Sequence, residues 1–350
     1  MAKNYGISMN KVLVLGYFGY TTNKLDGQTV KTRDIYRLVN EQLSTSFIDY
    51  YDTEDLKSNK FSVVKMFCKV IRCSTLIYLP AQNNLRYFFP IIYLISLLFR
   101  VQIHYFVVGG WLKEYLGHLP IHRVLLSKIA GIHAETQRMK KELEDSYNFN
   151  NVDTFPNFRY FNFTPLHTAS IKLRLVFMAR IMKNKGIDWI FELADIIDQK
   201  QFQDRFSITF YGQINEEDYD YFTQNVQKYS FVEYNGPLQP SEIHEALSQH
   251  DVMLLPTHFY TEGLPGSIVD AYISGIPVIV TDWKHSREFV DHGHSGYIVP
   301  FDNGQKQMIE FIFALEKNRE LLMRLQKNAL MKRMQFAPPL IDSYLYNSCK

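Results

Sequence analysis

Two carboxylates, Glu262 and Asp270, lie on either side of a segment that predicts a loop entering a helix at Gly266. The first N–H groups of a helix have no partner within it, so the amides of Gly266, Ser267 and Ile268 would suit a phosphate. Carboxylates accept hydrogen bonds from sugar diols. A hexose, a pyrophosphate and a ribose follow one another in a nucleoside-diphosphate sugar, so we expect Glu262 at the hexose and Asp270 at the ribose. The alternative is that the two carboxylates only cap the helix and form salt bridges.

The elements that position these residues are predicted from short apolar runs separated by helical patterns, which indicate parallel sheets covered on both faces. The alternation occurs twice, before and after a linker at 156–168 that contains two prolines. Strands are expected at 11–15, 46–50, 76–79, 103–108, 129–133, 152–155, 173–178, 207–211, 231–234, 252–255, 278–281 and 297–299. Among the expected helices are those at 89–99, 241–248 (capped by Ser241), 266–274 and 309–331.

The predicted fold class is therefore α/β, with two doubly wound, Rossmann-like domains that face each other across a cleft. We expect a first domain at 1–165, a second at 166–332, and a C-terminal tail at 333–350 that returns to the first. In open sheets of this kind ligands bind beyond the carboxyl ends of the strands. The loops expected to hold ligands are those at 16–29, 109–112, 180–186, 212–215, 236–239, 257–266 and 282–286.

The composition excludes several classes of protein. A chain of 350 residues that is 46% hydrophobic and 21% charged can bury real cores and is not a disordered chain. Three cysteines, Cys68, Cys73 and Cys349, are odd in number and lack metal-ligand spacing, which excludes a disulfide framework and favours a reducing compartment. No secretory signal is visible in the first ten residues. We therefore expect a cytoplasmic protein.

The net charge of +2 hides an asymmetry between the two halves of the chain. Residues 1–165 have 20 Lys and Arg against 13 Asp and Glu, whereas residues 166–350 have 18 against 23. The basic first half suits an anionic partner such as a phospholipid surface or a lipid-linked phosphate; ordinary surface variation is an equal alternative. The apolar run Phe88–Phe99, between Arg86 and Arg100, is shorter than the ~20 residues of a membrane span and predicts a buried helix.

The carboxylate segment resembles the donor signature of retaining glycosyltransferases of family 4, which have the GT-B fold. The resemblance rests on the Glu262-x7-Asp270 spacing, the small-residue helix that follows, and Gly275-Ile-Pro277-Val-Ile. In the same order along the chain, Arg180-x4-Lys185-Gly186 resembles the family's Arg-x4-Lys-Gly loop. The resemblance implies that Arg180 and Lys185 neutralise the departing diphosphate and that Glu262 positions the hexose. A solvated turn is the alternative for the two cations.

Further site residues follow from the same resemblance. Gly236, Pro237 and Leu238 resemble the segment whose backbone holds the nucleobase, and Gly263, Leu264 and Pro265 belong to the donor loop. His258 would touch the donor sugar, or is only a partly buried loop histidine. On the acceptor side we expect Gly27, Gln28, Gly109, Gly110 and Trp111, for which tight turns and an edge-packed aromatic are the alternatives. Asp218-Tyr-Asp220 imitates a metal-binding pair but is better explained as a solvated helix start, so no metal site is expected.

Two departures from the family pattern are clear. The second carboxylate is Asp270 rather than the commoner Glu. Many members of the family have a donor-contacting histidine after the fourth strand of the first domain, whereas this chain has Gly109-Gly110-Trp111 there and His104 inside the strand. A catalytic histidine is therefore not assigned.

The resemblance implies a metal-independent, retaining glycosyltransferase of hexosyltransferase type, without a cofactor. It would transfer a sugar from a nucleotide-diphosphate sugar, with UDP as the expected nucleotide, to a glycan or lipid-linked glycan. The pathway would be polysaccharide biosynthesis, such as that of capsule or lipopolysaccharide. We expect peripheral contact with the inner face of an anionic membrane and no nucleic-acid partner. The alternatives are a non-catalytic, nucleotide-sugar-binding regulatory subunit and a sugar-nucleotide epimerase.

Overall fold

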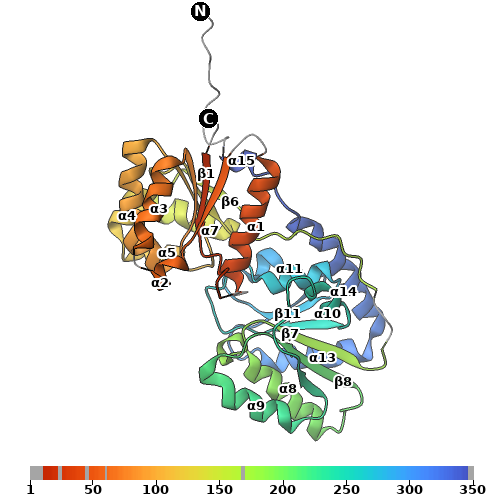
Figure 1. Cartoon of the computed structure of the whole chain (residues 1–350). Helices are drawn as coiled ribbons and strands as arrows, with labels where there is room; N and C mark the ends of the chain where they lie inside the picture. The colour runs from red at the N-terminus through yellow and green to blue at the C-terminus, as the bar shows by residue number, and fades with distance from the viewer. Residues whose placement is uncertain (1–10, 23–25, 44–46, 60, 167–169, 346–350) are drawn as a thin grey trace, which may run out of the picture. The chain divides into compact units, whose positions relative to one another are not determined.

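The computed structural model describes residues 11–22, 26–43, 47–59, 61–166 and 170–345. It divides the chain into two compact units (Figure 1). The first ends at Phe158 and resumes at Pro338, and the second is Arg159–Ala337. The boundary between Phe158 and Arg159 falls inside the predicted linker. The chain re-enters the first unit at Pro338, a few residues after the predicted domain end at 332. Residues 333–336 stay with the second unit because Arg333 Nη1 donates to the carbonyl of Phe163 (2.8 Å) and Arg159 N donates to that of Phe336 (3.0 Å).

The first unit is a six-stranded parallel sheet with the order β2-β1-β3-β4-β5-β6. Its strands are β1 (Lys11–Gly16), β2 (Phe47–Asp52), β3 (Thr75–Leu79), β4 (Gln102–Phe106), β5 (Gly131–Ala134) and β6 (Val152–Thr154). Its helices are α1 (Gly27–Gln42), α2 (Asp55–Ser58), α3 (Ser62–Arg72), α4 (Gln82–Phe99), α5 (Leu112–Gly117), α6 (Pro120–Leu126), α7 (Gln137–Tyr147) and α15 (Asp342–Leu345). Ser46 of the predicted second strand lies outside the described residues, as does Cys349.

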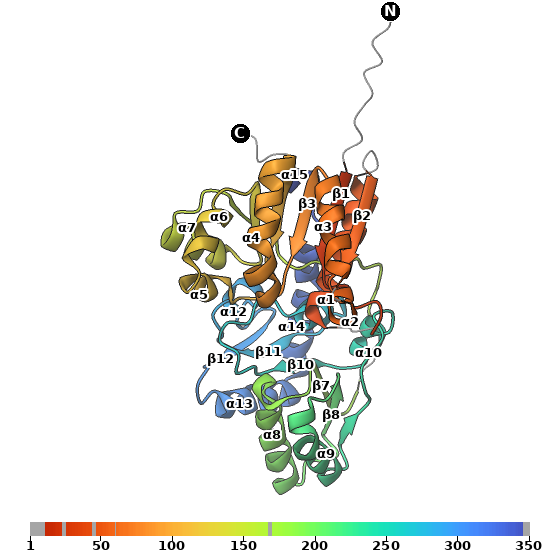
Figure 2. The same cartoon turned by 60° about the vertical axis from the view of Figure 1, so that its left-hand side comes forward.

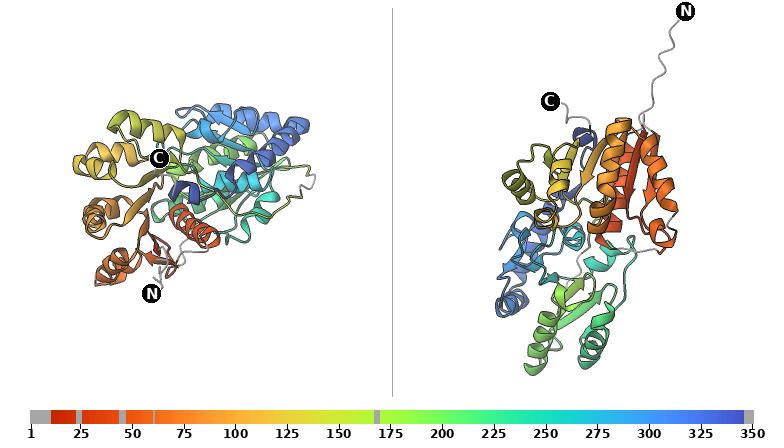
Figure 3. Two further views of the ribbon diagram at one scale, coloured as in Figure 1. Left: turned by 90° about the horizontal axis from the view of Figure 1, so that it is seen from above. Right: turned by 90° about the vertical axis from the view of Figure 1, so that its left-hand side faces the viewer.

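Both faces of this sheet are covered. Helices α3 and α4 lie side by side on one face, where Phe89 and Tyr78 are fully buried (Figures 2 and 3). On the other face the returning chain packs against the sheet through Tyr344, whose ring lies 5.7 Å from that of His133. Gln42 holds the return by donating to the carbonyl of Pro339 (2.9 Å) and accepting from the amide of Ile341 (2.8 Å).

Helix α4 begins at Gln82, about two turns earlier than the helix expected at 89–99, and it contains Pro90. Proline has no N–H for the carbonyl four residues before it, here that of Arg86. The buried His122 supplies the missing donor, since its Nε2 lies 3.1 Å from the Arg86 carbonyl and 3.2 Å from that of Leu85. The prediction that this helix is buried is wrong for one of its faces, because Leu94 and Leu98 are exposed.

The second unit is a six-stranded parallel sheet with the order β12-β11-β10-β7-β8-β9. Its strands are β7 (Leu173–Met178), β8 (Phe206–Tyr211), β9 (Val232–Tyr234), β10 (Val252–Leu255), β11 (Val278–Thr281) and β12 (Gly296–Val299). Its helices are α8 (Ile187–Gln199), α9 (Tyr219–Lys228), α10 (Ile243–Ser248), α11 (Gly266–Ile273), α12 (Ser286–Phe289), α13 (Gln305–Lys317) and α14 (Arg319–Lys332), with short 3-10 turns η1 (Lys183–Lys185), η2 (Glu216–Asp218) and η3 (Arg333–Phe336).

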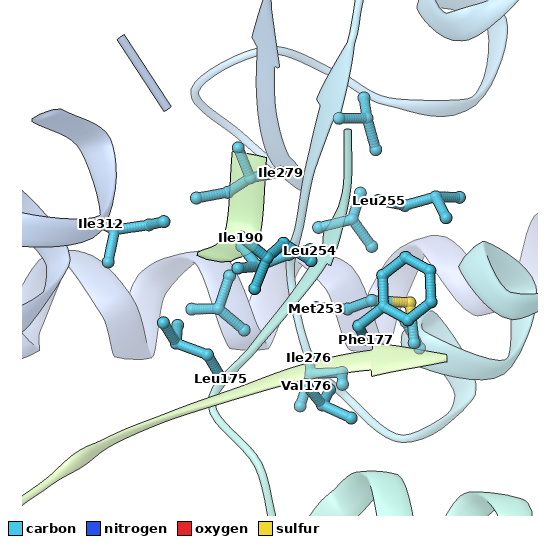
Figure 4. Close-up of a cluster of buried hydrophobic side chains, with 14 of the residues drawn as sticks. Leu175, Val176, Phe177, Ile190, Met253, Leu254, Leu255, Ile276, Ile279 and Ile312 are labelled. Atoms are coloured by element: carbon cyan, nitrogen blue, oxygen red, sulfur yellow. The ribbon is translucent and has the colours of Figure 1, made fainter. Parts of the chain in front are cut away.

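The central strands of this sheet are buried on both sides. Figure 4 shows Leu175 and Phe177 of β7 and Leu254 of β10 with Ile190 of α8 and Ile312 of α13. Helices α8, α9 and α13 cover one face, and α10, α11 and α14 cover the other (Figures 1 and 2). Continuous apolar strands are what a sheet covered on both faces requires.

Two local predictions in this unit are wrong. The helix expected at 309–331 is two helices, because Asn318 ends α13 and caps α14, its side chain accepting from the amide of Leu321 (2.9 Å). Ser241 does not cap the helix expected at 241–248, which begins at Ile243 without a side-chain cap. At the level of architecture, the prediction of two doubly wound α/β units is confirmed. Within the described ranges, no helix has both the length and the apolar character to cross a bilayer.

Candidate active site

The strand order of the second unit reverses between β7 and β10, which are hydrogen-bonded neighbours. Ligands of open α/β sheets bind at such a switch point, beyond the carboxyl ends of the strands. The loops that follow these two strands are joined there: the amide of His258 donates to the carbonyl of Asn184 (2.9 Å). Gly186 permits this approach, since its φ is +86° and a β-carbon at that position would overlap the carbonyl of Pro256.

Lys185 and Glu262 are brought together by these two loops. Lys185 Nζ forms an ion pair with Glu262 Oε2, and both side chains are mostly buried, with exposures of 17% and 19%. The ammonium also lies over the ring of Phe259, 5.0 Å from its centroid. Lys185 and Glu262, which the sequence suggested as a cation and a carboxylate of the donor site, are far apart in the sequence but in contact at the switch point.

Helix α11 begins next to this pair, after Pro265, and no described side chain caps its first turn. Ile268 N donates to the carbonyl of Pro265 (3.1 Å), whereas no described group accepts from the amides of Gly266 and Ser267. The start of a helix also carries the positive end of its dipole. Of the three amides predicted to bind phosphate, Gly266 and Ser267 are thus unpartnered among the described residues, whereas that of Ile268 already donates to Pro265.

Arg159 reaches the same helix start from the segment that follows the first unit. A β-carbon on Gly266 would overlap the guanidinium of Arg159, so the glycine leaves the space that this cation occupies. Arg159 Nε donates to Asp270 Oδ1 at 3.1 Å. Sequence reasoning missed Arg159; the available signal was that it is the only Lys or Arg in the predicted linker at 156–168.

Asp270 is buried, with 4% of the residue exposed. In addition to Arg159, His244 Nε2 lies 3.4 Å from the same Oδ1 oxygen. A carboxylate buried in this way needs a charged or hydrogen-bonding partner, and here Arg159 is that partner. The structure therefore places Asp270 beneath Arg159.

Two other predicted donor residues, Arg180 and His258, take no part in the ion pair. Arg180 is exposed and pairs with no acidic side chain in the described ranges; it precedes Ile181, which bridges to Ile214 in the loop after β8. His258 turns toward helix α8, where its Nε2 lies 3.0 and 3.2 Å from the two carboxylate oxygens of Asp188.

The predicted nucleobase segment follows β9. Gly236 adopts a φ of +76°, and its carbonyl accepts from the amide of Gly212 (3.0 Å), which joins this loop to the one after β8. Leu238 packs against the core, and Pro237 is exposed. The Gly236 carbonyl thus already accepts a hydrogen bond from the protein, so a nucleobase would contact the backbone of the residues that follow Gly236.

In the first unit, two predicted acceptor residues, Gln28 and Trp111, line one pocket of about 310 Å³. It lies at the carboxyl ends of β3 and β4 and the start of α1, and its other lining residues are Pro80, Ala81, Gln82, Asn83 and Val108. An aromatic ring and amide side chains are groups that can stack on and hydrogen-bond a neutral sugar. Sequence reasoning missed Gln82 and Asn83, although Pro80 marked the end of β3 at the same sheet edge.

The glycines expected beside this pocket differ in their roles. Gly109 has a φ of +80°, and a β-carbon there would press on the Trp111 ring at 3.1 Å. Gly110 is buried, whereas Gly27 is exposed with open space around it. The Nε2 of Gln28 is buried and has no hydrogen-bond partner among the described residues.

Buried ionisable groups lie behind this edge of the sheet. Lys31 Nζ donates to Glu135 Oε1 (2.6 Å) and to the carbonyl of Val107 (2.7 Å). Burial lowers the pKa of Lys31, and the partner carboxylate opposes that change. His104 Nδ1 and His133 Nε2 are 3.1 Å apart. Burial lowers the pKa of His104 to about 4 and that of His133 well below its usual value, so both rings are neutral near pH 7.

Comparisons with known proteins show which proteins this chain resembles. Residues 172–318 match the family model described as "Glycosyl transferases group 1". The chain is 26% identical over 137 residues to the amylovoran biosynthesis glycosyltransferase AmsK of Erwinia amylovora, covering 38% of this chain and 33% of that protein. It is 30% identical over 101 residues to the N,N'-diacetylbacillosaminyl-diphospho-undecaprenol alpha-1,3-N-acetylgalactosaminyltransferase of Campylobacter jejuni, covering 29% and 26%. These matches span about a third or less of each relative's length.

A solved structure is similar over nearly the whole chain. HepE of Anabaena, in complex with UDP-glucose, superimposes with a TM-score of 0.73 at 14% identity, covering 97% of this chain and 98% of that one. The likeness shows the fold, and the expected GT-B fold is confirmed.

Proposed function

We propose that this chain, in which residues 172–318 form a domain of the glycosyl transferases group 1 family, is a retaining glycosyltransferase. It would move a hexose from a nucleotide-diphosphate sugar to a glycan or lipid-linked glycan in the synthesis of a polysaccharide such as a capsule or lipopolysaccharide. One observation carries the proposal: the Lys185–Glu262 ion pair lies at the switch point beside the uncapped start of α11.

In this proposal the second unit binds the donor. The diphosphate would accept hydrogen bonds from the amides of Gly266 and Ser267 and from the side chains of Lys185 and Arg180. Glu262 would then exchange its bond to Lys185 for hydroxyl groups of the hexose. The loop at 263–265, His258 and the backbone at 236–238 would complete the donor site. UDP is the first nucleotide to test, because the fold neighbour HepE was solved with UDP-glucose.

The reaction exchanges one bond for another. The bond between the anomeric carbon and the diphosphate oxygen breaks, a bond from that carbon to the acceptor oxygen forms, and the acceptor proton passes to the leaving phosphate. Charge grows on the diphosphate as the first bond breaks. Lys185, Arg180 and the positive end of α11 would stabilise that charge, and such preorganised groups are usually the largest contribution to catalysis. We expect no metal and no cofactor beyond the donor itself.

The first unit would bind the acceptor. Trp111 offers a ring face for a sugar, and Gln28, Gln82 and Asn83 offer amide groups for its hydroxyls. Lining of this kind, without a charged side chain in the pocket, suits a neutral sugar. We further propose that the chain works in the cytoplasm at the inner face of a membrane, in keeping with the free thiols of Cys68 and Cys73 and the basic first half.

A turnover assay tests the proposed function. The full chain is incubated with UDP- and GDP-sugars, with and without lipid-linked glycan acceptors, and both nucleotide release and product are measured. We expect UDP release that an acceptor accelerates, and a product with the anomeric configuration of the donor. A product with the opposite configuration would refute retention. Conversion of the donor to its epimer without acceptor would favour an epimerase, and binding without turnover would favour a regulatory subunit.

A further inference from the structure

Helix α4 of the first unit carries apolar side chains on its solvent face as well as on its core face. Tyr87, Ile91, Leu94 and Leu98, spaced as one helix face, are 63%, 47%, 59% and 72% exposed. The solvent face of a surface helix is normally polar, and a helix that is apolar all round is normally covered. No described residue covers this stripe, and Figure 2 shows α4 on the outer side of the unit.

Neighbouring helices widen the stripe into a surface. Helix α3 contacts α4 through Phe67 and Phe88, whose rings are 6.5 Å apart. It adds the exposed Val64, together with the exposed Phe61 that immediately precedes the helix. Helix α6, on the other side of α4, adds the exposed Ile121 and Val124. We call these exposed residues of α3, α4 and α6 the apolar face. Contiguous exposed apolar surface of this kind marks a site for a protein partner or a membrane.

The charges around the apolar face are of one sign. Between Asp55 and Glu114 the sequence contains no Asp or Glu. The exposed charged side chains of α3, α4 and the residue that ends α4 are all basic, namely Lys65, Arg72, Arg86 and Arg100. The partner of this face is therefore expected to be anionic. A second copy of this chain would place cation against cation, which disfavours a dimer through the same face.

We infer that the apolar face docks on an anionic phospholipid bilayer, with α4 lying in the interface. The core face of α4 holds Leu85, Phe89 and Ile92 against the sheet, so the helix cannot leave the unit to cross the membrane. An interfacial helix instead buries its outer apolar side chains at the boundary between headgroups and acyl chains, while flanking Lys and Arg side chains reach the phosphates.

The acceptor pocket lies at one end of the same helix. Gln82 and Asn83, in the first turn of α4, line the pocket, and the stripe begins at Tyr87, about 7 Å further along the helix axis. A helix seated on the bilayer would therefore hold the pocket near the membrane surface, where the sugar of a lipid-linked acceptor is found. This docking surface rests on the proposed function for its purpose, although bilayer binding itself needs neither donor nor acceptor.

Vesicle co-sedimentation of the full chain tests the inference. The probes are vesicles of phosphatidylcholine alone and of phosphatidylcholine mixed with phosphatidylglycerol, at low and high salt. We expect binding to the anionic vesicles, weakened by salt. The double variant Leu94→Glu/Leu98→Glu should lower that affinity by about tenfold or more, since apolar burial is lost and the added charges are repelled. The variant Arg72→Gln/Arg86→Gln, which removes two of the four basic side chains, should bind more weakly and lose part of its salt dependence.

The matched control is Met323→Glu/Met331→Glu on α14, which changes two side chains of similar exposure (59% and 55%) in the second unit. It should bind vesicles like the wild type. No binding of the wild type to anionic vesicles at low salt would overturn the inference. So would equal binding by the α4 variant, or sedimentation velocity showing a dimer that only the α4 variant disrupts. UDP binding, measured by calorimetry on the same variants, tests the donor site separately, so a failed bilayer inference is not confused with a failed proposed function.

Discussion

Arg159 and Asp270 form a largely buried ion pair that holds a cation over the first residue of α11. The Nε of Arg159 lies 3.1 Å from Asp270 Oδ1, and the two side chains are 15% and 6% exposed. The pair changes the role proposed for Asp270, which we now infer to be a positioning residue. In this view Asp270 orients the guanidinium of Arg159, which lies at the start of α11, where the diphosphate or ribose of the donor would bind.

The first prediction concerns this pair. Asp270→Asn and Arg159→Gln should each raise the donor KM about tenfold, in line with a lost hydrogen bond to a charged group, and change kcat much less. The double variant should raise the donor KM little more than either single variant, because each single variant already breaks the Arg159–Asp270 pair. Steady-state kinetics with varied donor measures these effects.

The control for this prediction is Asp251→Asn, which breaks the comparable pair Arg174–Asp251 (2.9 Å, exposures of 17% and 8%). It should lower the stability of the second unit and leave the donor KM unchanged. Donor KM values in the Asp270 and Arg159 variants equal to wild type would remove the proposed role of the pair.

A second prediction concerns the cations of the loop after β7. Lys185→Ala and Arg180→Ala should each lower turnover by about 10²-fold or more, since charge on the leaving diphosphate is no longer stabilised. Lys228→Ala is the control, because it removes a cation from an exposed pair with Asp195. Near wild-type turnover in both loop variants, with the protein folded, would reject the phosphate assignment.

The third prediction separates two glycines with left-handed backbones. Gly236→Ala should cost about 1–2 kcal/mol of unfolding free energy, the strain of that conformation for a residue with a β-carbon. Gly186→Ala should cost at least about 1 kcal/mol more, because its β-carbon must also displace the Pro256 backbone. Urea unfolding of both variants measures the difference, and equal costs would contradict the close approach of the two loops.

The fourth prediction is a pH dependence of stability. The folded-state pKa values of His104 and His133 are lowered by burial, so between about pH 6.5 and pH 4 the unfolded chain binds protons that the folded chain does not. Stability should therefore fall as the pH drops through this range, by up to about 1.4 kcal/mol per pH unit for each histidine.

Urea unfolding at a series of pH values measures this slope. The double variant His104→Leu/His133→Leu should show a shallower slope than the wild type, and the exposed-site control His118→Gln should not. A slope that is the same in the double variant and the wild type would show that other groups cause the acid sensitivity.

The strands of both sheets and the meeting of Lys185 with Glu262 can be predicted from sequence, because each depends on a regular pattern along the chain. Strands buried on both faces are continuous apolar runs, so β7, β10 and β11 match their predicted bounds. Because the carboxyl ends of parallel strands share one sheet edge, residues such as Lys185 and Glu262 can be expected together before their contact is seen.

The parts that sequence reasoning missed depend on single tertiary contacts. No periodicity links Arg159 to Asp270, since Arg159 lies in an irregular segment. Likewise, Pro90 normally argues for a helix start, and the donor that replaces its missing N–H is the distant His122, which no local pattern links to α4. Interruptions at one polar residue, such as Asn318 between α13 and α14, are equally hard to see within an otherwise helical pattern.

A crystal structure of the full chain with UDP bound would show directly where the diphosphate lies. We expect the β-phosphate within about 3 Å of Lys185 Nζ and of the Gly266 and Ser267 amides that begin α11, and we expect Glu262 to leave Lys185 and turn toward the sugar side. A nucleotide bound elsewhere in the chain, with the Lys185–Glu262 pair intact and the start of α11 empty, would contradict this expectation.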